Sequence, residues 1–367
     1  MRSLHRLPKA HLHLHLEGAM RPATLAELAA ERGEHPPDSR SFGSFADFGT
    51  LYGAAARLVR EGPRGNLLRL VREVVEDAAA DGAVWVEPHL NPLTYEDDPD
   101  AALDLLDEVV DEGRRTGARL GVGFGILVFA RRHADPSEAL KAARLAADRP
   151  GRGVVGFGLA GDEARHGPEP FAEAFAIARA AGLIAAPHAG EFAGPAGVRA
   201  ALDVLGARRI AHGVRAVEDP ALLARLAAEG TVLDVCPTSN VALGVVASLS
   251  EHPLPLLLRA GVRCTLNADD PLLFGPGLLQ EYETARTALA LTDHQLAAVA
   301  RTSLEASGAP RTTVEDAITR IGAWLTAPAT TSRPSQDTLR PGTAGPPAPQ
   351  RERRPPSPRP PGSCASC

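Results

Sequence analysis

The first residues suited to chemistry are three histidines at alternate positions, in "HLHLHLEGAM" over residues 11–20. Imidazole is a common metal ligand, so a metal site is the first hypothesis. On a strand, side chains two residues apart share a face and lie about 6.6 Å apart, so His11 and His15 would be about 13 Å apart. One ion can therefore take only a neighbouring pair. We expect that pair to be His13 and His15, nearest the strand end, and His11 to be structural.

Histidines and acids also follow later apolar runs of the chain. They are Asp162 and Glu163, which follow Gly161 in "LAGDE", His188 and Glu191 in "HAGE", His212 in "RIAHG", and Asp269 and Asp270 in "LNADD". One histidine after a strand is weak evidence of a site, but the pattern recurs after five runs. If the runs are parallel strands of a barrel, their C-terminal ends meet at one mouth, where such folds place their active sites.

Eight short apolar runs alternate with amphipathic helical stretches, which predicts the fold. The runs cover residues 10–16, 83–90, 118–128, 153–161, 183–190, 209–213, 231–237 and 262–270. Strands that are apolar on both faces are typical of a parallel sheet covered by crossover helices. We therefore predict an α/β fold, a (β/α)8 TIM barrel, with extra helices between strands 1 and 2 at 22–33, 45–59 and 63–82. An open doubly wound sheet is the alternative, but it would gather its chemistry at one crevice.

Composition limits the domain organisation and the partners. We assign residues 1–326 to the barrel and expect residues 327–367, rich in proline, arginine and serine, to be disordered. In that tail, the Cys-x-x-Cys pair Cys364 and Cys367 lacks a second pair and is taken as incidental. A net charge of −6 disfavours a nucleic-acid partner. No apolar run is long enough to span a membrane and no secretory signal is apparent, so we expect a cytoplasmic location.

Several other motifs are given structural interpretations. The Gly-x-Gly-x-x-Gly pattern at 156–161 lacks the acidic residue that a dinucleotide site places about 20 residues further on. Cys236 is interpreted as a small buried residue. Neither Lys9 nor Lys141 is placed to bridge two metals from a barrel strand, which favours a single metal ion.

The motifs "LPKAHLHLHLEGAMRP", "LAGDE", "HAGE", "RIAHG", "DVCPTSN" and "LNADDPLLF", in this order, resemble the adenosine deaminase family of metal-dependent amidohydrolases over about residues 7–325. The resemblance implies one Zn²⁺ per subunit, with the ligands His13, His15, His188 and Asp269. It implies the catalytic residues Glu191, His212 and Asp270. It implies a purine substrate held by His15, Glu17, Gly161 and Asp270.

Such a site would replace the amino group of a 6-aminopurine by oxygen. Zinc lowers the pKa of a bound water from about 15.7 to about 7. As a hypothesis, His212 and Asp269 orient this water and take its proton. Glu191, kept protonated by burial, would protonate N1 of the ring, and Asp270 would hydrogen-bond N7.

The resemblance leaves the group on N9 of the purine open. Adenosine-specific members carry aspartate at Glu17, where it meets the ribose 5′ hydroxyl, and a bulkier residue is common in "CPTSN". We expect adenosine or 2′-deoxyadenosine, converted to inosine or 2′-deoxyinosine with release of ammonia, narrowly ahead of adenine and aminodeoxyfutalosine. An inactive purine-binding relative is the alternative of another class, although all the implied ligands and the proton donor are present.

Overall fold

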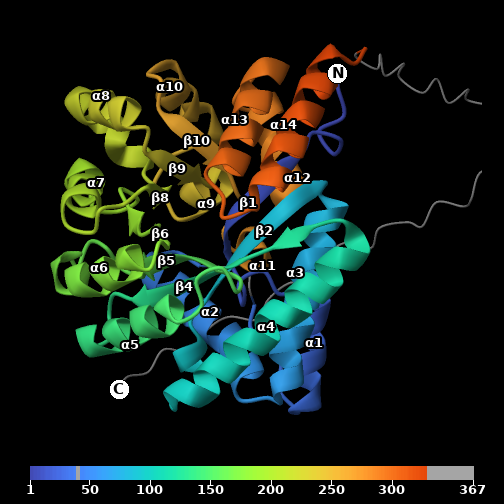
Figure 1. Cartoon of the computed structure of the whole chain (residues 1–367), viewed down its shortest axis with the longest axis vertical. Helices are drawn as coiled ribbons and strands as arrows, with labels where there is room; N and C mark the ends of the chain where they lie inside the picture. Colours follow the sequence, from blue (N-terminus) through green and yellow to red (C-terminus); the bar gives the residue numbers. More distant parts are fainter. Residues whose placement is uncertain (39–41, 329–367) are drawn as a thin grey trace, which may run out of the picture. The chain divides into compact units, whose positions relative to one another are not determined.

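The computed structural model describes residues 1–38 and 42–328. Parallel strands that carry the predicted site motifs lie inside a ring of helices (Figure 1). The strands are β1 (Lys9–His15), β2 (Ala83–Leu90), β3 (Gly123–Phe124), β4 (Ile126–Arg131), β5 (Val154–Ala160), β6 (Ile184–Ala185), β7 (His188–Ala189), β8 (Arg209–His212), β9 (Val232–Val235) and β10 (Arg263–Leu266). Most of the predicted tail, with Cys364 and Cys367, lies outside the described residues.

Helices connect the strands. They are α1 (Pro22–Glu31), α2 (Phe45–Arg60), α3 (Arg64–Ala80), α4 (Pro99–Leu120), α5 (Pro136–Ala147), α6 (Ala172–Ala180), α7 (Gly194–Asp203), α8 (Pro220–Glu229), α9 (Pro237–Ala242), α10 (Leu254–Arg259), α11 (Pro271–Phe274), α12 (Leu278–Thr287), α13 (Asp293–Glu305) and α14 (Arg311–Thr326). Short 3₁₀ turns include η1 (Pro92–Thr94) and η4 (Leu249–Glu251).

The strands form two parallel sheets that close on each other. Their orders are β1-β2-β4-β5-β6, with β3 beside β2, and β10-β9-β8-β7. At one junction, the Asp269 amide donates to the His13 carbonyl and the His15 amide to the Asp269 carbonyl, both at 3.1 Å. At the other, the Arg208 amide donates to the Ala185 carbonyl at 3.0 Å. The predicted TIM barrel is confirmed, with α1, α2 and α3 between its first two strands.

The structure differs from the predicted elements in detail. The fifth run is divided into β6 and β7 around Pro187, because proline has no amide hydrogen for the ladder. Helix α13 was not predicted, although Thr292 and Gln295 form a capping box at its start. The short helices α9 and α11 begin inside the motifs "DVCPTSN" and "LNADDPLLF". No helix was predicted from the sequence in either motif.

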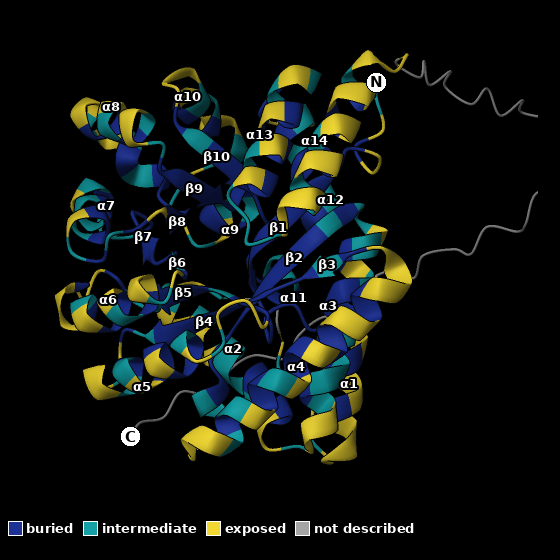
Figure 2. Cartoon of the chain, viewed as in Figure 1, coloured by how far each residue is buried: buried dark blue, intermediate teal, exposed yellow. Residues whose placement is uncertain are grey.

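The barrel interior is buried, whereas the outer faces of the helices are exposed (Figure 2). Every residue of β1 is buried, including Lys9 and three histidines. Burying ionisable groups costs free energy unless they find partners. Lys9 Nζ donates to two backbone carbonyls, so its burial is explained within the fold. The buried histidines are therefore the side chains of β1 that indicate a functional site. Across the described residues, no helix has both the length and the apolar character to cross a membrane.

Candidate active site

Four side chains with metal-binding atoms meet at the C-terminal end of the barrel strands. They are His13 and His15 at the end of β1, His188 in β7, and Asp269 after β10. Nε2 of His13 and Nε2 of His15 lie 3.1 and 3.3 Å from Nε2 of His188. The same two atoms lie 3.1 and 3.5 Å from Oδ1 of Asp269. The fold thus brings together the four residues that the resemblance implied as ligands.

The hydrogen bonds of this cluster fit a bound cation. Nδ1 of His188 lies 3.0 Å from the Leu159 carbonyl, and Nδ1 of His13 lies 3.4 Å from the Asp234 carbonyl. A carbonyl only accepts, so each Nδ1 carries a proton, and in the neutral rings that a metal requires the two Nε2 atoms face each other as bare acceptors. Converging acceptors repel unless a cation lies between them. Ligands of a tetrahedral zinc ion would be about 3.4 Å apart, close to the observed spacing.

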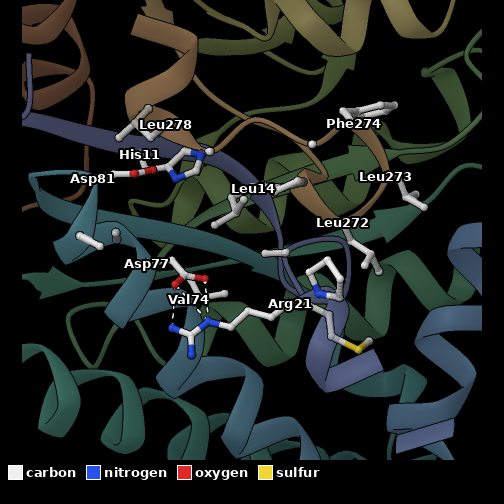
Figure 3. Close-up of a pocket in the computed structure, with 18 of the residues that line it drawn as sticks. His11, Leu14, Arg21, Val74, Asp77, Asp81, Leu272, Leu273, Phe274 and Leu278 are labelled. Atoms are coloured by element: carbon white, nitrogen blue, oxygen red, sulfur yellow. Dashed lines mark hydrogen bonds and ion pairs between the residues drawn. The ribbon is translucent and has the colours of Figure 1, made fainter. Parts of the chain in front are cut away.

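His11 lies outside this cluster, as the strand geometry predicted. It lines a separate cavity of about 700 Å³ with Arg21 and Asp77 (Figure 3). Its Nε2 accepts the Ala268 amide at 3.1 Å. Burial lowers the pKa of His11 to about 3, so the ring is neutral. Its hydrogen bond supports the backbone segment that leads to Asp269.

Two of the site residues have a left-handed backbone. His212 has φ +65° and Asp269 has φ +61°. Such conformations cost a non-glycine residue about 1–3 kcal/mol and persist where the surrounding structure enforces them. At Asp269 the enforcement is visible, because its amide and carbonyl both bond to β1.

The adjacent residues Asp269 and Asp270 have opposite protonation behaviour. Although burial opposes it, the electrostatic interaction and the hydrogen bond with His13 lower the pKa of Asp269 well below its usual value. Burial and the neighbouring Asp269 carboxylate raise the pKa of Asp270 well above its usual value. A Cβ at Gly18 would lie 1.7 Å from Oδ1 of Asp270, so only glycine leaves room for this carboxyl group.

Glu191 has the properties of a buried carboxylic acid. Burial, then the Asp269 and Glu163 carboxylates, raise its pKa well above the usual value. Its Oε1 is buried without a hydrogen-bond partner in the described part of the chain. The same oxygen lies 3.5 Å from Nε2 of His212. The raised pKa favours the protonated form of Glu191, which can offer its proton to a bound molecule.

Glu163 fixes the loop that carries Glu191. Its Oε1 accepts the amides of Glu191, Phe192 and Ala193 at 2.8, 2.6 and 2.5 Å. Sequence reasoning placed Glu163 at a strand end but gave it no role. The three amides that it binds lie far along the chain, so no local pattern could reveal the contact.

Sequence reasoning also missed the roles of two residues in "CPTSN". Ser239 donates from Oγ to Oδ2 of Asp269 at 2.7 Å. The side-chain amide of Asn240 lies 3.1 Å from Nδ1 of His212. Both residues come from α9. At the level of the sequence, this motif served for the family resemblance, for Cys236 and for residue size, and Ser239 and Asn240 were given no role.

A cavity of about 280 Å³ opens beside the metal-binding cluster. Its lining includes His15, His188, Glu191, His212, Asp269 and Asp270, together with Gly161. Aromatic walls come from Phe45, Phe48 and Tyr52 of α2 and from Phe129 of β4. Gly161 has φ +111°, a conformation that favours glycine. The cavity thus combines flat aromatic walls with a cluster of histidine and carboxyl groups.

Glu17 does not line this cavity within the described structure. Its carboxylate accepts the hydroxyl groups of Tyr95, at 2.7 Å, and Tyr52, at 3.1 Å. Tyr52 belongs to α2 and Tyr95 directly follows η1. Both carboxylate oxygens therefore have partners within the protein.

The closed barrel and the donor set at its mouth define a metal-dependent hydrolase of the amidohydrolase class. The profile of the family "Adenosine deaminase" matches residues 8–324. The chain therefore belongs to the adenosine deaminase family, and it is a hydrolytic deaminase acting on C–N bonds.

Individual relatives agree with this assignment. A Streptomyces virginiae protein with the provisional name adenosine/adenine deaminase is 44% identical over 336 residues, covering 89% of this chain and 98% of that protein. The crystal structure of an adenine deaminase from Arthrobacter aurescens matches with TM-score 0.81 and 29% identity, over 87% of this chain and 99% of that one. An amidohydrolase from Burkholderia ambifaria, with bound Zn, matches with TM-score 0.76 and 26% identity, over 88% and 92%.

Proposed function

We propose that this protein is a zinc-dependent deaminase that converts a 6-aminopurine and water into the 6-oxopurine and ammonia. The observation that carries the proposal is that Glu191, a buried acid with a raised pKa, lines one small cavity together with His15, His188 and Asp269 of the metal-binding cluster. Together these groups can activate water on one side of a flat ring and supply a proton on the other.

The metal-binding cluster would supply the nucleophile. Zinc bound by His13, His15, His188 and Asp269 would lower the pKa of a water from about 15.7 to about 7. Asp269, whose Oδ2 is oriented by Ser239, takes a proton from the attacking water as its oxygen adds to C6 of the purine. His212, with Nε2 3.8 Å from the same Oδ2, holds the oxygen in place.

Glu191 and Asp270 act on the purine ring. Addition at C6 places electrons on N1, and Glu191 donates its proton there. Asp270, whose pKa is raised by burial and by the Asp269 carboxylate, donates a hydrogen bond to N7 in its protonated form. The C6–N bond then breaks, and the amino group leaves as ammonia with the proton that Asp269 took from the water. The hydroxyl group on C6 loses its remaining proton as the 6-oxo group forms, and Glu191 regains a proton, so no net proton is consumed.

The cavity favours adenine itself over a nucleoside, which reverses the order expected from the sequence. Its volume of about 280 Å³ lies at the low end of ligand pockets. Glu17, the position implied to meet a ribose hydroxyl, has both carboxylate oxygens bonded to tyrosines. The Arthrobacter aurescens neighbour is likewise an adenine deaminase.

A nucleoside, either adenosine or a 5′-extended form such as aminodeoxyfutalosine, is the second candidate. The observation that favours it is a polar edge of the cavity, formed by Arg131, His133 and Asp162. These side chains could bind hydroxyl or acidic groups beyond the purine.

Ammonia release by the zinc-loaded protein tests the proposal. The substrates are adenine, adenosine, 2′-deoxyadenosine and aminodeoxyfutalosine. We expect kcat/KM for adenine to exceed that for each nucleoside by at least about 10-fold. A nucleoside as the better substrate would overturn the choice of adenine, and no ammonia from any of the four would overturn the deaminase proposal.

A further inference from the structure

His212 is linked to a chain of hydrogen bonds that begins at a backbone amide. The Leu254 amide donates to Nδ1 of His252 at 3.1 Å. Nε2 of His252 lies 3.2 Å from Oδ1 of Asn240, and Nδ2 of Asn240 lies 3.1 Å from Nδ1 of His212. Asn240, His252 and His212 are all buried.

The backbone amide fixes the direction of every bond in this chain. Because Nδ1 of His252 accepts the Leu254 amide, the proton of this neutral ring must be on Nε2. Burial lowers the pKa of His252 to about 4, which agrees with a neutral ring. Nε2–H of His252 then donates to an oxygen, so Oδ1 of Asn240 faces it. The opposite orientation of the Asn240 amide would place two donors against each other.

The remaining group of Asn240 determines the state of His212. Its Nδ2–H donates, so Nδ1 of His212 must be an acceptor without a proton. A proton on Nδ1 would face the amide hydrogens of Asn240. The proton of the neutral ring is therefore on Nε2, between Oε1 of Glu191 at 3.5 Å and Oδ2 of Asp269 at 3.8 Å.

We propose that Asn240 and His252 are positioning residues that hold His212 as the Nε2–H tautomer, so that this ring donates a hydrogen bond to the reacting oxygen and does not remove its proton. The inference rests on the proposed function for the identity of that oxygen, whereas the tautomer follows from the geometry alone. It leaves Asp269 as the base. It also gives "CPTSN" a role, because its serine orients Asp269 and its asparagine orients His212.

The tautomer can be measured without any substrate. The zinc-loaded protein is labelled with ¹⁵N-histidine, and long-range ¹H–¹⁵N correlation spectra distinguish Nε2–H from Nδ1–H rings; loss of one signal set in His212→Gln assigns the ring. We expect His212 to show a bare Nδ1 and a protonated Nε2. A protonated Nδ1 in the wild-type protein would overturn the proposal, whether or not the protein deaminates adenine.

Variants of the relay separate positioning from simple stability. In His252→Phe, Asn240 loses its fixed orientation, so we expect signals of both His212 tautomers and a kcat lower by about 10- to 100-fold. KM and zinc content should stay within about twofold of wild type. His252→Gln keeps a donor for Oδ1 of Asn240 and should restore most of kcat. His294→Gln, at an exposed position of α13, is the matched control.

Two results would contradict the relay. One is a His212 ring that remains entirely Nε2–H in His252→Phe while kcat falls. The other is a His252→Gln variant as slow as His252→Phe, although both bind zinc. If either variant does not fold, the wild-type tautomer still decides the question.

Discussion

At the scale of single residues, the site contains carboxyl groups whose pKa values are shifted in opposite directions. The histidines around Asp269 lower its pKa, whereas burial beside other carboxylates raises the pKa values of Glu191 and Asp270. The proposed acid and base roles therefore rest on environment, not on residue type.

Glu191→Gln tests the proton donor. Glutamine keeps the shape of the side chain but has no acidic proton, so we expect kcat to fall by about 10²- to 10⁴-fold. Steady-state kinetics measure the change, and zinc content measured by atomic absorption is the control. Near-wild-type turnover by this variant would exclude Glu191 as the donor.

The pH profile tests the protonation state of Glu191. In the proposed mechanism the active form of Glu191 is protonated, and burial beside Asp269 and Glu163 raises the pKa of this group. We therefore expect kcat/KM to be retained below the raised pKa and to fall as the pH rises through it. The residual kcat/KM of Glu191→Gln should not fall in this way as the pH rises. If it still falls, the titrating group is a residue other than Glu191.

At the scale of elements, the loop after β7 is held by a side chain from the segment after β5. The three amides bound by Glu163 set the backbone from which Glu191 projects. Helix α2 is linked to the end of β1 in a similar way, through the bond from Tyr52 to Glu17. Such cross-links place functional groups more accurately than a free loop would.

Substitutions of Glu163 test the first of these links. Glu163→Ala removes the acceptor of three amides, so we expect kcat to fall by about 10- to 100-fold. Glu163→Gln keeps an acceptor oxygen, so its kcat should fall much less. When Glu191→Gln is already present, adding Glu163→Ala should lower kcat little further, because both substitutions impair the same proton donor. Fully additive losses would show that Glu163 does not act through Glu191.

At the scale of the whole molecule, the barrel closes around a buried charged network. Arg209 of β8 lies 2.7 Å from Glu87 of β2 and 2.7 Å from Asp234 of β9. It also donates to the Leu12 carbonyl of β1 at 3.3 Å. One side chain, 1% exposed, thus links four strands beneath the metal-binding cluster.

Arg209→Met tests this network. The change leaves two buried carboxylates without their cation, so we expect the free energy of unfolding to fall by about 3–5 kcal/mol. Urea denaturation of wild type and variant measures the difference. Arg311→Met, which breaks an exposed ion pair with Glu315, is the matched control and should cost less than about 1 kcal/mol. An equal decrease in the free energy of unfolding in both variants would contradict a stabilising role of the buried Arg209 network.

Metal removal links the site to the whole fold. A cation that binds only the folded chain stabilises it, so chelation should abolish deamination and lower Tm. Zinc should restore both in the wild-type protein, whereas in His188→Ala it should restore much less of either. Full activity after exhaustive chelation would contradict a metal-dependent mechanism.

The sequence by itself was sufficient to predict the barrel, its added helices and the family. Periodic apolar runs and strand-end motifs are local patterns, and His13, His15, His188, Glu191 and Asp269 appear within them. Strand spacing also separated His11 from the predicted metal pair. The ligand roles themselves stay predictions until a metal is measured.

Only the tertiary structure decided how these residues are held. The contacts of Glu163, of Asn240 with His252, and of Tyr52 and Tyr95 with Glu17 join segments from different strands and helices. Hydrogen-bond direction, burial and pKa depend on such neighbours, which no linear motif contains. For that physical reason the sequence indicated the reaction, whereas the fold was needed to propose a tautomer for His212 and to propose adenine ahead of adenosine.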